Sequence, residues 1–336
     1  DVSGLPTFYT LIGVGGVVAG VVSVLLLPWG WTRAAEPFHG LNLLVVNSTV
    51  PEYPLALVLG MGLLARGWIR LGAVAALVFV CMTTEPTYGE QRKFEARNFY
   101  GTLRVQFDPS TSTSRLRNGT TLHGFEVAEG SGQATSYYHP ASPIGQLMRR
   151  LMPRHVMAMG LGVGTLSAYA YEGDEYTFLE LNPLVEYVSA RSGLFTYVSR
   201  ARDRGARIDV ALGDGRLLAG ALPDGRWDLI VLDAFSSDSI PVHLLTVEAL
   251  QEYAHKVTPN GVIAVHVSNR FFDLGPMVAT EAEAIGWHWV IQSRGQEEAD
   301  ESASTWVMLT RTAEVAAGIG MNAEPWERPA LPAGLS

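Results

Sequence analysis

Four acidic residues closely follow apolar runs of the sequence, where a carboxylate could bind a cation or accept a proton. Glu180 falls at the end of one run, Asp214 follows the next, and Asp233 and Asp238 follow a third. The carboxyl ends of parallel strands meet at one edge of an open α/β sheet, and ligands bind at that edge. We therefore expect one acidic site. The alternative for Asp238 is that it only caps the helix beginning near residue 240.

A glycine-rich turn precedes the first of these acids. Gly160, Gly162 and Gly164 follow an apolar run, and glycines at such a turn let backbone N–H groups approach a ligand, with the N-terminus of the next helix behind them. Glu180 lies 20 residues after Gly160, where a carboxylate can accept hydrogen bonds from ribose hydroxyl groups. Thr165 stands where a dinucleotide site would carry a third glycine, which disfavours a dinucleotide. A tight turn without a ligand is the alternative.

The acids and the turn need a parallel sheet to bring them together. After residue 144 apolar runs alternate with helix-like segments, which indicates a sheet covered by helices on both faces. The runs are 155–159, 176–181, 208–212, 227–232 and 262–267, and the helical segments include 247–256 and 276–284. Two closing runs, 287–292 and 305–310, predict an antiparallel edge. The fold class is therefore α/β, with the Rossmann-like sheet typical of methyltransferases.

Shorter elements precede this sheet. Residues 100–107 and 121–127 alternate between apolar and polar side chains, and Asn118-Gly119 is a hairpin turn signal, so we predict a small antiparallel β module. The polar stretch 84–97 is interpreted as a linker. The predicted parts are a transmembrane helical segment 1–84, the linker and β module 85–143, a nucleoside-binding domain 144–315 and a C-terminal tail 316–336.

The N-terminal segment is apolar enough to predict a membrane anchor. Residues 2–32 carry no charged side chain, and residues 8–29 as a helix would extend about 33 Å, which crosses a hydrocarbon core of about 30 Å. The lack of a basic start and the further apolar runs 53–65 and 71–82 argue against a cleaved signal peptide. The runs 53–65 and 71–82 could form a re-entrant helical pair or two thin spans. Basic residues after this segment favour a multi-pass protein of the cell inner membrane with its catalytic domain in the cytoplasm. Arg66 and Arg70 would then lie on the other side, so the topology stays open.

Composition excludes several classes of protein. The chain has 336 residues, of which 48% are hydrophobic and 17% charged, so it is neither disordered nor a disulfide-stapled module, and its single cysteine, Cys81, cannot form an internal disulfide. A net charge of −9 argues against nucleic acid as a partner and fits a cationic substrate. No cluster of His, Cys and Asp has metal-ligand spacing, so we expect no metal.

Several aromatic and histidine side chains are further candidates. Tyr137 and Tyr138 could contact a cation through their rings, with packing as the equal alternative. His123 is interpreted as a turn residue whose ring is satisfied. His243 and His266 are interpreted as structural partners near the site.

Taken together and in order, the motifs resemble the membrane-fused spermidine synthase-like family of aminopropyltransferases. The segment 227–270 contains "DLIVLDAFSSDSIPVHLLTVEAL" and "GVIAVHVSNR", which look like that family. "RNFYGTLRV" at 97–105, "NGTTLHG" at 118–124, "GLGVGT" and "FLELNP" fit the same pattern. The apolar stretches "FYTLIGVGGVVAG" and "EYPLALVL" extend the resemblance to about residues 8–311.

The resemblance implies a fold that binds S-adenosylmethionine or decarboxylated S-adenosylmethionine as co-substrate. In it, the glycines would line the aminopropyl side of the nucleoside, Glu180 would hold the ribose, and Asp214 would bind the adenine amino group. The implied cofactor-binding residues are Gly160, Gly162, Gly164, Glu180, Asp214, Gly215 and Asp233. Asp233 matches the catalytic aspartate, which orients the attacking amine and accepts its proton. Asp238, Tyr137 and Tyr138 complete the catalytic candidates.

Departures from the family pattern leave the reaction open. Segment 134–140 lacks the glutamate of the tyrosine-histidine-glutamate segment that grips the diamine in ordinary spermidine synthases, and Asn182 stands where an aspartate is common. The first hypothesis is aminopropyl transfer to a small amine in polyamine biosynthesis, releasing methylthioadenosine. Alternatives are a lyase that cleaves S-adenosylmethionine without an acceptor, a methyltransferase, and a non-catalytic nucleoside sensor. The expected partners are a small-molecule amine, or none beyond the nucleoside, and the lipid bilayer, but no nucleic acid; a homo-oligomer stays open.

Overall fold

The computed structural model describes residues 90–119, 121–127, 132–234, 241–269, 273–296 and 299–320. The predicted membrane segment 1–84 and residues 321–336 of the predicted tail lie outside these ranges. Within them, no helix combines the length and the hydropathy that crossing a bilayer requires. The described residues fall into two compact units, the first with residues 90–104 and 118–119, the second with residues 105–117 and those from 121 onward.

The predicted β module is present as a sheet of four strands. These are β1 (Gln91–Asn98), β2 (Gly101–Asp108), β3 (Thr113–Asn118) and β4 (Thr121–Val127), in the order β1-β2-β3-β4. The prediction of a linker over 84–97 was wrong for its second half, since β1 begins at Gln91. This strand lies at the sheet edge and its first three residues are exposed, so its charged side chains hide it from a search for apolar alternation.

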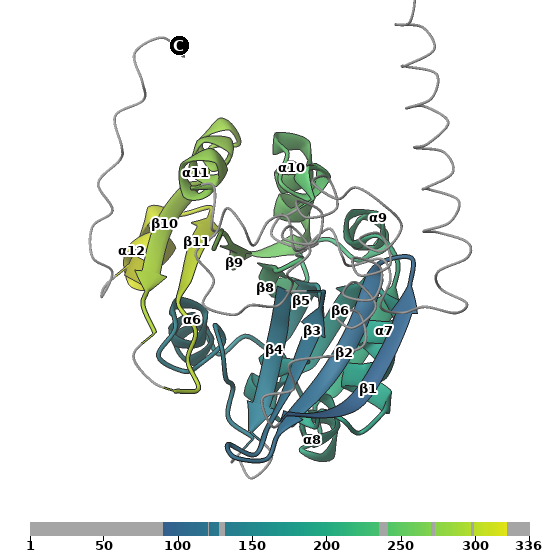
Figure 1. Cartoon of the computed structure of the whole chain (residues 1–336). Helices are drawn as coiled ribbons and strands as arrows, with labels where there is room; N and C mark the ends of the chain where they lie inside the picture. The colour runs from purple at the N-terminus through teal and green to yellow at the C-terminus, as the bar shows by residue number, and fades with distance from the viewer. Residues whose placement is uncertain are drawn as a thin grey trace, which may run out of the picture. The chain divides into compact units, whose positions relative to one another are not determined.

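The predicted Rossmann-like sheet is also confirmed, with seven strands among the described residues. Their order is β10-β11-β9-β8-β5-β6-β7 (Figure 1). The strands are β5 (His155–Met159), β6 (Glu175–Glu180), β7 (Arg207–Leu212), β8 (Trp227–Leu232), β9 (Val257–His266), β10 (His288–Arg294) and β11 (Ser304–Thr310). The strands β5 to β9 pair in parallel, whereas β11 runs antiparallel between β9 and β10, as the two closing runs predicted.

Helices cover both faces of this sheet. One face carries α9 (Gly215–Ala221), α10 (Val247–Lys256) and α11 (Gly275–Ala284), whose apolar side chains pack with alternate residues of the strands. On the other face lie α6 (Pro143–Leu151), α8 (Tyr197–Asp203) and α12 (Ala313–Gly320). The short helices are η3 (Thr165–Tyr169), α7 (Pro183–Glu186), η4 (Tyr187–Arg191) and η5 (Val242–Leu244).

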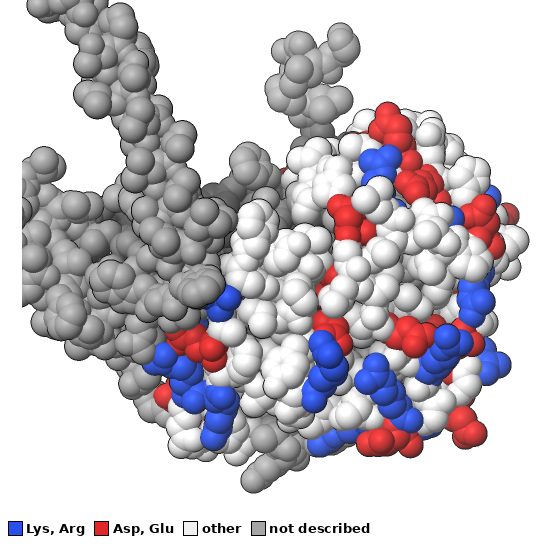
Figure 2. Space-filling model, turned by 90° about the vertical axis from the view of Figure 1, so that its right-hand side faces the viewer, with Lys and Arg blue, Asp and Glu red and all other residues white. Residues whose placement is uncertain are grey.

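Alternation along the central strands separates the core from the face that builds the site. Met157, Met159, Ile230 and Leu232 point into the core beneath α9 to α11 and are almost fully buried. Residues of odd number in β8 therefore point to the opposite face, and Asp233 continues that series. On the part of the surface shown outside the grey atoms in Figure 2, acidic and basic side chains are interspersed, as on an ordinary hydrated surface.

Candidate functional site

The glycine turn after β5 lies against two other candidate segments. Gly160 has a φ of 96°, and a Cβ there would come within 2.4 Å of the Asp233 carbonyl oxygen. Gly162 has a φ of 54°, and its Cβ would lie 2.8 Å from the carbonyl oxygen of His123. Glycine is therefore required for both the conformation and the close approach. The backbones of β4 and of the segment after β8 therefore both lie against this turn, at the carboxyl end of β5.

The element after this turn differs from the expected helix. It is the five-residue 3₁₀ helix η3, which begins after Gly164. The Arg204 guanidinium donates to the carbonyl oxygens of Ser167, Ala168 and Ala170, which a continuing helix would need for its own hydrogen bonds. The N-terminus of a long helix is therefore absent behind this turn, and the turn itself must supply any backbone contacts to a ligand.

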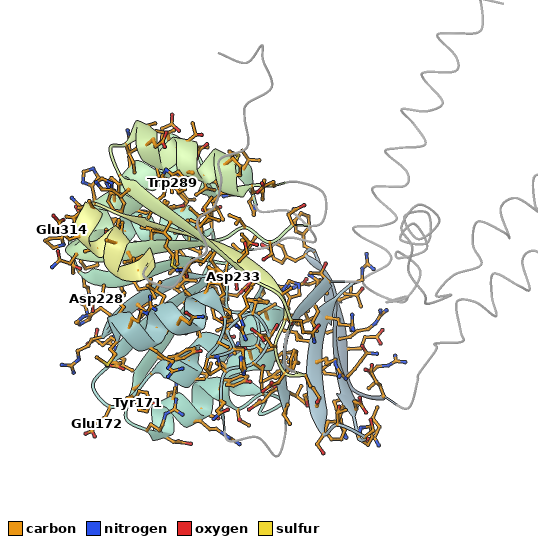
Figure 3. The ribbon with its side chains drawn as sticks, turned by 90° about the vertical axis from the view of Figure 1, so that its left-hand side faces the viewer. Tyr171, Glu172, Asp228, Asp233, Trp289 and Glu314 are labelled. Atoms are coloured by element: carbon orange, nitrogen blue, oxygen red, sulfur yellow. The ribbon has the colours of Figure 1, made fainter. Side chains whose placement is uncertain are left out.

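Asp233, labelled in Figure 3, follows the carboxyl end of β8. It is the centre of a buried hydrogen-bond network. Its side chain is 8% exposed, Tyr138 Oη donates to its Oδ2 at 2.7 Å, and its Oδ1 lies 2.7 Å from His266 Nδ1. The Tyr137 ring packs against the rings of Tyr138 and His266 beside this carboxylate. Burial, followed by the charge of Asp233, raises the pKa of both tyrosines well above the usual value, so both hydroxyl groups stay protonated.

The strand register explains why these residues meet. Leu232 of β8 pairs with Val265 of β9, so Asp233 and His266 follow at the same level. His266 in turn stands opposite Trp306 of β11. Its ring is stacked on Trp306 at 4.6 Å and 14°, and the Tyr137 ring lies 4.6 Å away at 31°. Three neighbouring strands thus place an acid, an imidazole and an indole side by side on one face of the sheet.

Both ring nitrogens of His266 have hydrogen-bond partners. Ser268 Oγ accepts the N–H of Thr305 at 2.8 Å and lies 2.7 Å from His266 Nε2. Nδ1 carries a hydrogen and donates a hydrogen bond to the Asp233 carboxylate, because a carboxylate can only accept. Asp233 therefore accepts hydrogen bonds from Tyr138 and from His266.

Glu180 connects the glycine turn to the end of β6. Its Oε2 accepts the N–H of Leu161 at 2.9 Å and its Oε1 accepts the N–H of Asn182 at 2.8 Å. Burial raises the pKa of Glu180, and the backbone N–H groups partly oppose that rise. Each carboxylate oxygen can accept a further hydrogen bond. Asn182 itself caps α7 by accepting the N–H of Leu184, a role that an aspartate would fill equally well.

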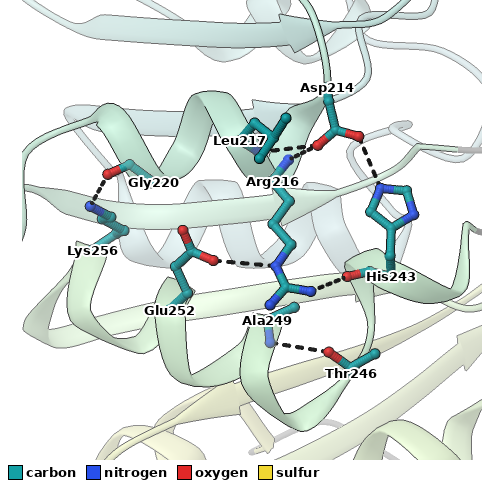
Figure 4. A network of polar contacts seen from close by, with 9 residues as sticks. All are labelled: Asp214, Arg216, Leu217, Gly220, His243, Thr246, Ala249, Glu252 and Lys256. Carbon is teal, nitrogen blue, oxygen red and sulfur yellow. Dashed lines mark hydrogen bonds and ion pairs between the residues drawn. The ribbon is translucent and has the colours of Figure 1, made fainter.

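Asp214 is placed at the end of β7, but most of its hydrogen-bonding capacity serves the protein (Figure 4). It is the N-cap of α9, where its Oδ1 accepts the N–H groups of Arg216 and Leu217. Its Oδ2 lies 3.1 Å from His243 Nε2. The predicted binding residue Gly215 begins α9, and its Cβ would lie 3.3 Å from the Met159 side chain. His243 is thus a structural partner, as predicted.

Because Asp214 caps the N-terminus of α9, we expect its replacement to reduce the stability of the fold in a pH-dependent way. Burial alone would raise the pKa of Asp214, but hydrogen bonds from Leu217, His243 and Arg216 outweigh it and lower the pKa below 3.8. The carboxylate therefore stabilises the fold at neutral pH, and this contribution is lost as the pH falls through the lowered pKa. We expect Asp214→Ala to reduce the free energy of unfolding by about 1 kcal/mol at pH 7, measured by urea titration.

Two comparisons check this interpretation. Asp214→Asn keeps a side-chain acceptor for the cap, so it should lose less stability than the alanine variant. The difference between wild type and Asp214→Ala should shrink as the pH is lowered. Equal stability of the alanine variant and the wild type at pH 7 would contradict the capping role.

His123 does not occupy a turn, as the sequence interpretation had it, but lies within β4. Its ring is not satisfied either: Nε2 is buried and finds no hydrogen-bond partner among the described residues. Burial lowers the pKa of His123, and the charge of Asp233 opposes that shift, so the two side chains lie within electrostatic reach of each other. Alternation in β4 could have placed His123 on a buried face, but no sequence pattern indicates an unpaired nitrogen.

The structure therefore gathers most of the predicted site residues at one edge of the sheet. Asp233, Tyr137, Tyr138 and the glycine turn are in one neighbourhood, which His266 and His123 join. Asp238 lies outside the described residues. In the part of the chain that the structure describes, no group of three or more His, Cys, Asp or Glu side chains is arranged to hold a metal ion.

Comparison with known proteins gives one sequence relative. No family model matches the chain. A polyamine aminopropyltransferase of Vibrio vulnificus (strain CMCP6) is 32% identical over 124 residues, which make up 35% of this chain and 38% of that protein. The match thus spans little more than a third of the curated relative's length.

Solved structures give a broader likeness. The spermidine synthase from Thermotoga maritima superposes with a TM-score of 0.50 at 14% identity, covering 67% of this chain and 74% of that one. A probable spermidine synthase from Corynebacterium glutamicum ATCC 13032 gives 0.52 at 16% identity, covering 70% and 87%. A spermidine synthase in complex with the transition state analogue AdoDATO gives 0.51 at 13% identity, covering 67% and 75%. The chain has the fold of these proteins.

Proposed function

We propose that this chain is a membrane-anchored, spermidine synthase-like enzyme. It would bind decarboxylated S-adenosylmethionine, transfer the aminopropyl group to an amine and release methylthioadenosine. The observation that carries the proposal is the buried carboxylate of Asp233, held by Tyr138 and His266 beside the glycine turn. The aminopropyltransferase relative and the shared fold support the same assignment.

Asp233 is suited to the chemistry of amine alkylation. The acceptor nitrogen attacks the methylene carbon bound to the sulfonium sulfur, the carbon–sulfur bond breaks, and its electron pair stays on sulfur as a neutral thioether. An ammonium has no lone pair for this attack, so a proton must leave the nitrogen. A carboxylate has about four lone-pair sites. Tyr138 and His266 each occupy one of them, which leaves lone pairs of the same carboxylate for the acceptor amine.

The other residues of the edge would bind the nucleoside. Gly160, Gly162 and Gly164 would face the three-carbon chain, and the free lone pairs of Glu180 would receive the ribose hydroxyl groups. Asp214 accepts two backbone N–H groups and contacts His243, and its side chain is 34% exposed. It could take one further donor, the adenine amino group, beside Gly215. Bound S-adenosylmethionine or its decarboxylated form would thus have its sulfonium near the Asp233 carboxylate.

The N-terminal segment would anchor this domain. We propose that residues 1–84 insert in the inner membrane and leave the nucleoside site in the cytoplasm, on the strength of the uncharged stretch 2–32. The full chain should then remain with membranes after alkaline carbonate washing. Its release into the supernatant would refute the anchor without touching the proposed reaction.

Products identified by mass spectrometry test the reaction. The purified full chain in detergent is incubated with S-adenosylmethionine or its decarboxylated form, with and without putrescine. Methylthioadenosine and an aminopropylated amine, formed only from the decarboxylated nucleoside with the diamine, would support the proposal. S-adenosylhomocysteine would indicate a methyltransferase, and nucleoside binding without any product would indicate a sensor; either result overturns the proposed transfer.

A lyase that cleaves S-adenosylmethionine is the second candidate. The composition of segment 134–140, which would bind the acceptor amine, favours it. Segment 134–140 contributes Tyr138 and His139 but no carboxylate that could bind a diamine. His139 contacts other parts of the protein: its Nδ1 accepts the N–H of Ala141, and its Nε2 lies 3.8 Å from Asp300. Methylthioadenosine formed from S-adenosylmethionine alone would select this candidate over aminopropyl transfer.

A further inference from the structure

His123 lies on the strand that covers the glycine turn. Its carbonyl oxygen is so close to Gly162 that a Cβ there would be 2.8 Å away, and a Cβ at Gly124 would lie 2.8 Å from Val163 Cγ2. Two consecutive residues of β4 are therefore packed on two consecutive residues of the turn. In the same turn, Gly160 approaches the backbone of Asp233 still more closely: a Cβ there would lie 2.4 Å from the Asp233 carbonyl oxygen.

The side chain of His123 carries an unused hydrogen-bonding atom. Nε2 is buried, and within the described ranges no protein atom is its partner. Buried polar atoms in folded proteins are nearly always paired, because an unpaired one has lost its water without compensation. A ligand that brings a donor or acceptor to this position would restore the missing hydrogen bond.

The charge around His123 indicates which kind of group that is. Burial lowers the pKa of His123 more than the charge of Asp233 raises it, so the ring is neutral at neutral pH. Tyr137 and Tyr138, whose pKa values are raised, are neutral as well. A neutral imidazole can present the lone pair of Nε2, and the nearby carboxylate of Asp233 adds a negative potential. Together they suit a cation that carries N–H donors.

We propose that His123 Nε2 accepts a hydrogen bond from the ammonium group on the three-carbon chain of the bound nucleoside. Both S-adenosylmethionine and its decarboxylated form carry this ammonium on the third carbon from the sulfur, whereas methylthioadenosine lacks it. His123 is thus a specificity-determining residue that separates the charged co-substrate from the spent nucleoside. The inference rests on the proposed function, since it needs a nucleoside at the glycine turn.

Calorimetric titration of the full chain with three nucleosides tests this role. His123→Phe keeps a ring of similar size and removes both nitrogens. It should weaken binding of decarboxylated S-adenosylmethionine and of S-adenosylmethionine at least tenfold, and change the affinity for methylthioadenosine by less than about threefold. His123→Gln restores an acceptor and should recover most of the loss. His288→Phe, at an exposed position of β10, serves as the matched control and should bind like wild type.

The outcomes separate the two proposals. If wild type binds no adenosyl-sulfonium nucleoside, the proposed function fails. If wild type binds them and His123→Phe weakens all three nucleosides equally, or none, the proposed function stands and the role of His123 is refuted. A loss confined to S-adenosylmethionine would refute it too, because the partner would then be the carboxylate that only this nucleoside carries.

Discussion

Asp233→Asn is expected to reduce aminopropyl transfer by about a thousandfold while the dissociation constant of the nucleoside changes less than about tenfold. An amide cannot accept the proton that leaves the attacking nitrogen, and positioned acid–base groups contribute about 10²- to 10⁴-fold to rates. The nucleoside keeps its contacts with the glycine turn and Glu180, so binding should survive. Single-turnover rates and calorimetric titration measure the two quantities separately.

Asp233→Asn is also expected to lower the stability of the fold, so its unfolding must be measured together with its rate. Tyr138 and His266 both donate to the carboxylate, and the amide NH₂ of asparagine would face one of these donors. A lost buried hydrogen bond of this kind costs about 1–3 kcal/mol, so thermal unfolding should report a modest decrease. Asp209→Asn changes an exposed acid of β7 that pairs with Arg207, and it should leave both rate and stability unaltered. Turnover of Asp233→Asn at the wild-type rate would eliminate Asp233 as the proton acceptor.

Most strands in the middle of the large sheet could be predicted from the sequence to within a residue, although β9 begins at Val257, about five residues before the predicted run 262–267. The run 227–232 coincides with β8 and 247–256 coincides with α10. Central parallel strands are buried on both faces and therefore form continuous apolar runs, which composition reveals directly. The edge strand β1 was missed because its charged side chains serve solubility rather than packing. The hydrophobic pattern of a sequence thus reveals strands that are buried, and it does not reveal a strand whose side chains are exposed.

The site was predictable only in part, because its members come from distant segments. Acids at strand ends could be recognised from the strands that carry them. That Tyr138 would donate to Asp233, 95 positions away, depends on tertiary packing that no local pattern encodes. The contact of His266 with Ser268, which in turn binds Thr305, and the lack of a partner for His123 Nε2 among the described residues also depend on tertiary packing. The residue types in the sequence indicated acid–base chemistry and nucleoside binding. The hydrogen-bond partners in the fold determine which atoms are left to contact a ligand.

Glu180→Gln is expected to weaken nucleoside binding by about a hundredfold and to leave the maximal rate at saturating nucleoside within a fewfold of wild type. Hydrogen bonds to a charged group contribute about 1.5–3 kcal/mol each, and the proposed ribose contact would use the carboxylate's remaining lone pairs. The amide can keep one of the two backbone bonds to Leu161 and Asn182, but its NH₂ group faces the other N–H. Calorimetric titration with methylthioadenosine isolates this effect, because that ligand has the ribose and lacks the charged chain.

A matched control lies on the same strand. Glu175→Gln makes the same chemical change at the opposite end of β6, where the side chain is partly exposed and pairs with Arg226. It should therefore bind methylthioadenosine like wild type. Glu180 also holds the glycine turn by accepting the N–H of Leu161, so the thermal unfolding of both variants must be measured as well. A Glu180→Gln chain that stays folded but binds methylthioadenosine weakly supports a direct ribose contact. Wild-type affinity in that variant would mean that the ribose is held elsewhere, and that the acids at this edge of the sheet do not share one nucleoside.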